Sequence, residues 1–351
     1  MNTLARRVSI YIIFLVMALS SCVREFPGVN PDGSVGIDPT LVTVDMELDI
    51  DLSLEPFAVL HHSRSESDEV MLRFIVEFTR DGKVVERVET FTDPASVSSG
   101  NLKLPVSVKL HALEYNVAVW GDFVLGTGHD PLCYDASDLY DIACKTPYVG
   151  CIDERQCFRG VTSLDLRPWR NQWNASVTVP VEMSRPQAKY RIIASDVDEF
   201  LSRSAKTRAG RGGYTMRFTY GIMPWSYDLW SGAVGAYANE VEFNVPLDFS
   251  LASDGLLLIG FDWLFAGDNV SDVSLTITMF DQYLVPVSRV SGIVVPLQKG
   301  RLTTVTGDFL TNEVGGSISI DTEWDGTIDI DADISMLSLI HISEPTRRTP
   351  I

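Results

Sequence analysis

The residue with the clearest chemical potential in this sequence is Cys22, the first of five cysteines. It follows Leu19-Ser20-Ser21, so a nucleophilic sulfur stands directly after two small side chains. Arg6 and Arg7 make the start of the chain positive, and the apolar run VSIYIIFLVMAL occupies residues 8–19. This order is typical of a secretory signal. The run is too short to span a bilayer, which needs about 20 residues.

The Leu-Ser-Ser-Cys sequence resembles a bacterial lipobox, in which the thiolate takes a diacylglycerol and the signal is cut before the cysteine. We therefore predict that residues 1–21 are a cleaved lipoprotein signal peptide. Residues 22–40, rich in Gly, Pro and Asp, are predicted to be a lipidated tether. The location expected is the outer membrane, with the protein held by lipid on Cys22 and exposed at the cell surface. An ordinary signal peptide with a chance cysteine is the alternative, and a periplasmic orientation stays open.

The other four cysteines lie close together in the sequence, and an even number in an exported chain suggests disulfides. Three pairings are possible, and the sequence does not choose among them. Free thiols are the second interpretation. A metal site is the weakest, because the spacing lacks the C-x₂₋₄-C pairs typical of zinc sites. The candidate disulfide residues are Cys133, Cys144, Cys151 and Cys157.

Catalytic patterns are missing from the sequence. It contains no G-x-S-x-G, H-E-x-x-H or P-loop motif. His61-His62 could contact a metal, but neighbouring strand residues point to opposite faces, and an exposed loop pair is favoured. Asp49 and Asp51 resemble a glycosidase pair only in residue type, and the wet face of a strand explains them better. We predict no enzyme activity, no cofactor and no metal. The net charge of −19 argues against a nucleic-acid partner.

Three aromatic side chains in PWSYDLW, Trp225, Tyr227 and Trp230, could stack on sugar rings. They favour an alternative function, a surface lipoprotein that binds glycans. A position in a core or between sheets is the preferred interpretation of these residues. The same aromatics would also suit a subunit interface, where Trp and Tyr are common hot spots.

Hydrophobic patterning predicts an all-β protein. Residues 42–54 alternate strictly between apolar and polar, the period of a half-buried strand. Asp81-Gly82 and Asp325-Gly326 are hairpin signals. Only two short helices are expected, over Asp135–Ile142 and over 197–201, and residues 202–213 are expected to form an exposed loop. Further strands are predicted over 72–79, 83–91, 104–110, 115–124, 175–183, 188–194, 214–220, 240–245, 256–261, 273–280, 292–297, 302–310, 317–321 and 327–330.

Arg185-Pro186 separates two such strand sets, which predicts two β-sandwich domains in tandem. Their expected bounds are 41–185 and 186–336. Residues 337–347, LSLIHISEPTR, resemble the in-frame translation of a sequencing-library adapter, so we predict that 337–351 is an artefact and leave it out of the fold. The best later candidate for a membrane span, residues 255–266, is short and interrupted by Asp262.

Several of these segments carry a family resemblance. In order along the chain they are YNVAVWGDF at 115–123, YDASDLYDI at 134–142, RPQAKYRIIASDVDEF at 185–200, VPLQKGRLTTVTGDFLT at 295–311 and ISIDTEWDGTIDI at 318–330. Together with the lipobox they resemble the fimbrillin-associated anchor lipoproteins (FimB-like) of Bacteroides-type bacteria. The resemblance implies two transthyretin-like or immunoglobulin-like β-sandwiches. It implies a protein at the base of a fimbria that attaches it to the outer membrane and helps to set its length.

The resemblance also implies fimbrial subunits as partners. A sandwich has open sheet edges, so we expect a subunit to join by strand addition. The resemblance supplies no catalytic residue, and Cys22 is the only position whose chemistry it carries over. It does not identify the partner, the donor or acceptor strand, or the native C-terminus beyond Met336.

Overall fold

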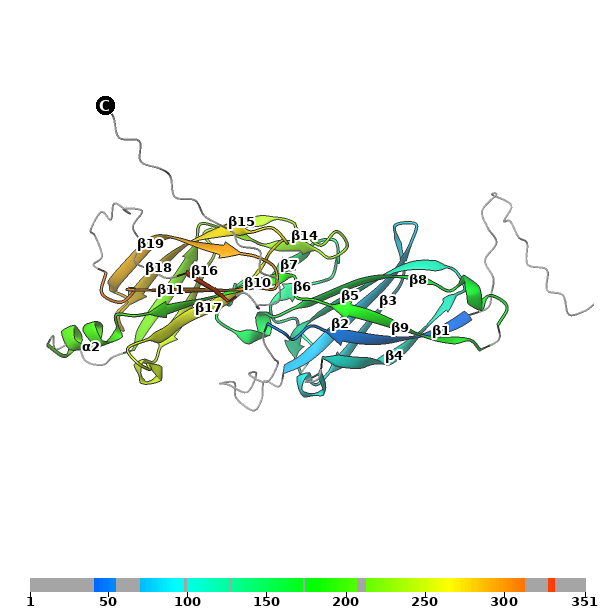
Figure 1. Cartoon of the computed structure of the whole chain (residues 1–351), viewed down its shortest axis with the longest axis horizontal. Coiled ribbons are helices and arrows are strands. Elements are labelled where there is room, and N and C mark those ends of the chain that lie inside the picture. The colour runs from blue at the N-terminus through cyan, green and yellow to red at the C-terminus, as the bar shows by residue number, and fades with distance from the viewer. Residues whose placement is uncertain are drawn as a thin grey trace, which may run out of the picture.

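The computed structural model describes residues 41–54, 70–97, 100–126, 128–172, 174–206, 213–312 and 328–331. These residues form two β-sandwiches placed end to end along the longest axis of the molecule (Figure 1). The all-β fold class predicted from the sequence is confirmed. Several predicted features lie outside the described residues: the signal peptide 1–21, the tether 22–40 with Cys22, His61-His62, the strand over 317–321, Asp325-Gly326 and the segment 337–351.

The first sandwich packs a three-stranded sheet against a four-stranded sheet. The three-stranded sheet has the order β4-β1-β9, and the other has the order β3-β2-β5-β8. Their facing side chains form one core, drawn from residues 42–183. The strands are β1 (Leu41–Ile50), β2 (Val70–Arg80), β3 (Lys83–Thr92), β4 (Asn101–His111), β5 (Glu114–Leu125), β8 (Phe158–Asp165) and β9 (Ser176–Met183).

Strand β1 forms where the alternating pattern predicted it. Every second side chain from Val42 to Ile50 is buried, and the intervening ones are exposed or half-buried. Each such apolar side chain contributes about 1.5–3 kcal/mol when fully buried. β1 pairs antiparallel with β4 and parallel with β9, so it is the central strand of its sheet. The strand ends at Ile50 rather than at residue 54, and the Ser53 amide donates to the Asp51 carboxylate just beyond it.

The first predicted hairpin is also confirmed. Asp81 and Gly82 join β2 to β3 with φ angles of 51° and 71°. Positive φ at both central residues defines the tight turn whose twist matches that of paired strands. Arg80 and Lys83 are the last cross-strand partners before the turn.

The second sandwich packs two four-stranded sheets, of order β17-β10-β20-β21 and β16-β11-β18-β19. Its core is drawn from residues 188–310. The strands are β10 (Gln187–Ala194), β11 (Tyr214–Tyr220), β16 (Glu242–Leu247), β17 (Leu257–Phe265), β18 (Ser271–Phe280), β19 (Pro286–Leu297), β20 (Leu302–Gly307) and β21 (Ile328–Asp331).

Short elements complete the described structure. Helix α2 spans Val197–Lys206, so the helical turn predicted over 197–201 is confirmed. The helix continues through residues 202–206, so the loop predicted over 202–213 is wrong for that part. Two small sheets have the orders β12-β15 and β14-β13-β7-β6. Their strands are β6 (Tyr134–Asp135), β7 (Ile142–Cys144), β12 (Ile222–Pro224), β13 (Ser226–Asp228), β14 (Ala233–Val234) and β15 (Tyr237–Asn239), and the 3-10 turns are η3 (Pro94–Val97), η4 (Asp153–Arg155), η5 (Arg167–Trp169) and η6 (Phe249–Leu251).

The helix predicted over Asp135–Ile142 is wrong. The segment folds as the β6–β7 hairpin instead. The Asp135 carboxylate accepts from the Ser137 amide, and the Asp138 carboxylate accepts from the Tyr140 amide. Aspartate side chains that bond the backbone two residues ahead favour turns over helix. The two aspartates therefore bend the segment, and Ile142 begins a strand.

Strand β8 lies in a region where no strand was predicted. It pairs with β5 along its length, and its other side meets β9, where Arg159 and Ser184 exchange two backbone hydrogen bonds. Gly160 makes this approach possible. A Cβ there would lie 2.6 Å from Met183 Sδ and 2.8 Å from the Glu182 carbonyl oxygen.

We predict that Gly160→Ala destabilises the protein by about 1–3 kcal/mol, because the added methyl overpacks the contact between β8 and β9. Gly213→Ala is the matched control, since a Cβ there meets nothing within 4 Å. Urea unfolding of the purified chain measures both. Equal midpoints for the two variants would show that the close approach of β8 to β9 is not needed.

Candidate functional site

The two sandwiches meet through a third apolar cluster that both halves build. From the first half it takes Trp120 on the outer face of β5 and residues of the β6–β7 hairpin. From the second half it takes Tyr227, Leu229 and Phe265. Strands β7 and β13 pair directly, so one small sheet crosses the boundary. We call this region the junction.

An ion pair between Arg155 and Asp262 lies at the centre of the junction. Arg155 belongs to η4 in the first half, and Asp262 belongs to β17 in the second. The Arg155 Nε and Asp262 Oδ1 atoms are 3.1 Å apart, and the two side chains are 2% and 0% exposed. The Arg155 guanidinium also lies 4.0 Å from the centre of the Tyr148 ring, a favourable cation–π distance.

Hydroxyl and amide donors complete the coordination of Asp262. Tyr148 and Tyr220 donate their hydroxyls to Asp262 Oδ2 at 2.8 and 2.7 Å. The Trp263 amide donates to Oδ1 at 2.8 Å, and the Tyr190 hydroxyl lies 2.5 Å from that of Tyr220. A buried charge is tolerated only when it is paired and hydrogen-bonded. Asp262 meets both conditions only when the two sandwiches are together.

The electrostatics of the pair follow from this enclosure. Burial raises the pKa of Asp262, while Arg155 and the two tyrosine hydroxyls act in the opposite direction. Burial disfavours the charge on Arg155, but Tyr134, Tyr148 and Asp262 outweigh it and raise the pKa of Arg155 well above its ordinary value. The guanidinium therefore stays charged across the physiological range.

Gln187 provides a second polar link across the junction. Its side chain is fully buried at the start of β10. The amide nitrogen donates to the Tyr134 hydroxyl at 2.6 Å and to the Arg155 carbonyl at 2.9 Å. Its oxygen accepts from the Cys157 amide at 3.0 Å. One side chain of the second sandwich thus forms hydrogen bonds with three polar groups of the first.

The disulfides predicted from the sequence are not formed in the structure, where all four cysteines are free. Cys133, Cys144 and Cys157 are buried in the junction cluster, and Cys151 is half-buried against the second core. They serve as small apolar side chains. Burial raises the pKa of Cys133 to about 12 and that of Cys151 to about 11. No three His, Cys, Asp or Glu side chains gather as metal ligands within the described residues.

The aromatics of PWSYDLW also lie in the junction. Tyr227 is fully buried, and Trp225 and Trp230 are half-buried against the same cluster. The predicted core or inter-sheet position is therefore confirmed. Trp230 stacks on Tyr140 at 5.9 Å between ring centres. These side chains connect the two halves, and they do not form an open platform on which a sugar ring could stack.

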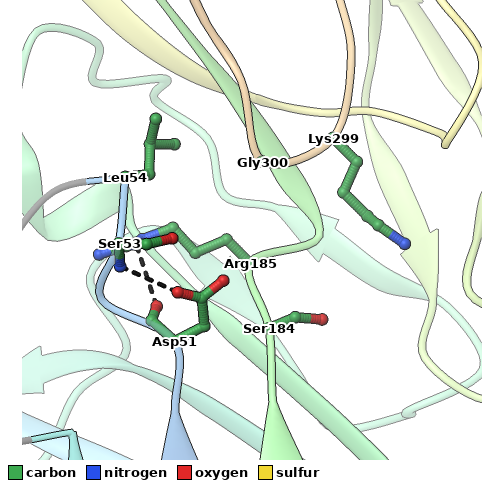
Figure 2. A pocket seen from close by; sticks show the side chains of 7 residues that line it. All are labelled: Asp51, Ser53, Leu54, Ser184, Arg185, Lys299 and Gly300. Carbon is green, nitrogen blue, oxygen red and sulfur yellow. Dashed lines mark hydrogen bonds between the residues drawn. The ribbon is translucent and has the colours of Figure 1, made fainter. Parts of the chain in front are cut away.

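A cleft of about 190 Å³ opens beside the junction (Figure 2). Arg185 donates to the Asp51 carbonyl and to the Gln156 side chain, while Lys299 points away from Arg185 and pairs with Asp268 at 2.6 Å. These cations are used within the protein, so we assign the cleft a structural role. Its lining residues are Asp51, Ser53, Leu54, Ser184, Arg185, Lys299 and Gly300.

The molecule has two different outer ends. At the end of the first sandwich remote from the junction, the described chain starts with Leu41, which pairs with His111. At the opposite end of the molecule lie α2 and the β18–β19 turn (Figure 1). The turn exposes large apolar side chains: Tyr283 is 77% exposed and Leu284 73%. The ring of Phe249 stacks on Phe200 of α2, which places η6 at the same end. Leu251, the last residue of η6, is 74% exposed.

The fold and junction define a protein of two coupled β-sandwiches. Residues 39–344 match the model of a Family of unknown function (DUF6562), and the chain belongs to this family. The matched range reaches into residues 337–351, whose origin in a sequencing adapter stays a prediction. Comparison with curated proteins finds no match.

Solved structures with a similar arrangement come from Bacteroides and Porphyromonas species. A proposed adhesin from Bacteroides ovatus is 13% identical, with a TM-score of 0.39, and the match covers 79% of this chain and 97% of that one. The fimbrial anchor protein Mfa2 from Porphyromonas gingivalis is 8% identical, with a TM-score of 0.38 and coverage of 75% and 90%. A proposed cell adhesion protein from Bacteroides eggerthii is 11% identical, with a TM-score of 0.39 and coverage of 83% and 95%. With TM-scores below 0.5, these likenesses carry no argument about function.

Among the described residues, no helix is long and apolar enough to cross a membrane. The prediction that lipid on Cys22 holds the protein concerns a residue outside that part of the chain.

We predict that Arg155→Met destabilises the protein by about 3–5 kcal/mol, because it leaves Asp262 buried without its counter-charge. The double variant Arg155→Met with Asp262→Leu should recover part of that loss, since it removes both charges. Denaturant unfolding followed by tryptophan fluorescence measures the series. A double variant that loses as much as the two single variants together would contradict the coupling.

We also predict that all four cysteines between residues 133 and 157 carry free thiols, and that the complete set reacts with a thiol reagent only after unfolding. At pH 8, Cys151 should react with iodoacetamide first, because it is half-buried, and Cys133, Cys144 and Cys157 should resist. Mass spectrometry of peptides after native and denatured labelling measures each site. If the cysteines react only after a reducing agent is added, they form disulfides, and the prediction made from the sequence would be right.

Proposed function

We propose that this chain is a non-catalytic outer-membrane lipoprotein that anchors a fimbria to the cell and limits its length. Lipid on Cys22 holds the first sandwich at the cell surface, and a fimbrial subunit binds the second sandwich by strand addition. The likeness to fimbrillin-associated anchor lipoproteins, read from the sequence, supports this proposal. The observation that carries it is the polarity of the molecule: the first described strand, β1, starts at one end, and the three most exposed large apolar side chains, Tyr283, Leu251 and Leu284, lie at the other.

The sheet edges support the second sandwich as the binding side. In the first sandwich, edge strand β3 contains Lys83, Glu86 and Arg87, and edge strand β4 contains Pro105. Charges and proline on an edge hinder pairing with another chain. β8 and β9, the other two edges, meet each other through Arg159 and Ser184.

Edge strand β19 also contains one charge, Arg289, and two prolines, but Pro286 and Pro296 stand near its two ends and leave the stretch between them open to pairing. Val287 and Val294 are 36% and 54% exposed along it, and the strand leads directly from the apolar turn at Tyr283 and Leu284. Exposed apolar patches mark protein interaction sites. In strand addition, backbone hydrogen bonds give affinity and alternate side chains fill pockets. β19 and its turn therefore suit a subunit that must bind tightly and point away from the membrane.

The junction contributes stiffness to this role. Pulling force enters at the lipid and leaves at the fimbria, so it crosses the boundary between the sandwiches. The ion pair of Arg155 with Asp262, the links of Gln187 and the strand pair β7–β13 all resist separation there. A flexible linker would carry tension without fixing the direction in which the fibre leaves the cell.

We predict that Cys22→Ser abolishes palmitate incorporation and releases fimbriae into the medium. Metabolic labelling and quantification of fimbriae in washed cells and supernatant measure the two effects. A Cys22→Ser chain that remains equally bound to membranes would contradict the lipid anchor. Deletion of the protein that leaves fimbriae attached and of normal length would contradict the anchoring role itself.

The apolar turn gives a second test. Tyr283→Ser with Leu284→Ser should lower co-purification of fimbrial subunits at least tenfold, because central aromatic and aliphatic contacts carry most of an interface's energy. Val84→Ser with Val85→Ser is the matched control, since both valines are 49% exposed on β3 of the first sandwich. If both double variants co-purify equal amounts of fimbrial subunit, the subunit does not bind at the turn.

A further inference from the structure

The outer end of the second sandwich presents two short turns, and an aspartate fixes each of them. In the β18–β19 turn, Asp281 Oδ1 accepts from the Tyr283 amide at 2.9 Å and from the Val285 amide at 2.8 Å. In η6, Asp248 Oδ1 accepts from the Ser250 amide at 2.9 Å. Aspartate side chains that bond the backbone a few residues ahead stabilise turns of this kind. Both turns are therefore held in one shape before any partner binds.

The two turns lie next to each other. β11 pairs with β16 on one side and with β18 on the other, and both strands end beside its first residues, Tyr214 and Thr215. Neighbouring strands are about 4.8 Å apart, so the two turns begin about 10 Å from each other. Residues 248–251 follow β16, and residues 281–285 follow β18. We call these two segments the tip.

The tip exposes apolar side chains at a cost to the protein. The three most exposed large apolar side chains among the described residues, Tyr283, Leu251 and Leu284, all belong to it. Leu284 is also strained, because its φ angle is 62°. Bulky side chains rarely adopt this left-handed conformation, in which the Cβ crowds the backbone, and Gly or Asn usually takes such positions. Among the described residues with positive φ, no other has an aliphatic side chain. Strain and exposure in the same leucine indicate that its side chain contacts another molecule.

The charges around the tip are mainly negative. Four carboxylates lie at this end, and none of them forms an ion pair among the residues that the structure describes. Two arginines nearby, Arg203 and Arg217, are paired with Glu199 and Glu242. Arg289 on β19 is the remaining described arginine of this end. Negative charge is repelled by anionic lipid headgroups and attracted by a basic protein surface. The four carboxylates belong to Asp198, Asp248, Asp254 and Asp281.

We propose that the tip inserts Tyr283, Leu284 and Leu251 into apolar pockets on the fimbrial subunit, and that basic side chains of the subunit surround those pockets. The inference rests on the proposed function and deepens it, because it states the chemistry of the surface that the subunit offers. Side chains on a preformed turn lose little conformational freedom on binding, which favours affinity. The contact adds to strand addition along β19. A second point of attachment at η6 fixes the orientation of the subunit about that strand.

The variant Leu284→Asn separates a contact role from a structural one. Asn adopts the left-handed conformation readily, so this variant should unfold at a higher urea concentration than the parent. Its binding should nevertheless fall at least tenfold, because the apolar contact is lost. The binding probe is fimbriae sheared from cells that lack this protein, with the mature full chain carrying Cys22→Ser as the soluble partner. Glu240→Asn is the matched control: Glu240 has a φ of 55° near the other end of the second sandwich, and this variant should bind like the parent.

Asp281 tests whether the fixed shape of the turn matters. Asp281→Ala removes the acceptor of two backbone amides and should lower binding about fivefold. Asp281→Asn keeps an acceptor at the same place and should recover most of the binding. Asp93→Ala is the control, since Asp93 accepts from the Ala95 amide at 2.8 Å in the first sandwich. Added salt should weaken the binding of the parent, because opposite charges meet across the contact.

Each outcome decides between the tip and another explanation. Equal binding by the parent and by Leu284→Asn, or an equal fall for Glu240→Asn, would overturn the inference and leave the fimbrial anchor intact. The inference is also wrong if Leu284→Asn loses binding to vesicles of phosphatidylethanolamine and phosphatidylglycerol, or loses self-association in the ultracentrifuge, and still binds fimbriae. The tip would then contact a membrane or a second copy of the chain. A parent chain that binds no fimbriae would instead remove the proposed anchoring role itself.

Discussion

The placement of the two sandwiches depends on two opposite charges that are buried at the boundary between them. Arg155 and Asp262 come from different halves of the chain, and their side chains are only 2% and 0% exposed to solvent. Such a pair costs free energy unless every remaining donor and acceptor finds a partner. Tyr148 and Tyr220 supply those partners to Asp262, one from each half. The arrangement of the two sandwiches is therefore tied to the geometry of one carboxylate.

Apolar packing around this pair explains the unusual burial of the neighbouring strands. β2 and β5 are buried on both faces over most of their length, because the first core covers one face and the junction covers the other. Arg73 and Asp122 form a bidentate pair under that cover at 2.8 and 2.7 Å. Arg87 extends the same layer by donating to the Ala136 carbonyl. The first sandwich is thus built to receive the second.

The sequence predicted the strands wherever one face of a sheet meets water. β1 shows a strict period of two. Asp81-Gly82 specifies the β2–β3 hairpin through local backbone preference alone. Prediction from the sequence failed where contacts between distant parts of the chain decide the structure. β8 lacks a clean alternation, and Gly160 within it reads as a loop residue until the approach of β9 is known. The cysteines suggested disulfides because composition cannot distinguish a cross-link from four small side chains in a core.

The junction itself could not be predicted from pattern. Arg185, Gln187 and Lys189 alternate with apolar residues, and such polar positions ordinarily face solvent. Here they are 4%, 0% and 8% exposed, because the first sandwich covers that face of β10. The interruption of the apolar stretch 255–266 by Asp262 was visible in the sequence. Its partner, 107 positions earlier in the chain, was not.

The central claim is that both sandwiches move as one body. It is tested most directly by double electron–electron resonance between spin labels at Glu86→Cys and Asp272→Cys, two exposed sites in different sandwiches. The chain would also carry Cys22→Ser and Cys151→Ser, so that only the introduced thiols are labelled. The account predicts one narrow distance distribution. A broad or multiple distribution would contradict it, because the junction would then not fix the direction from membrane to partner.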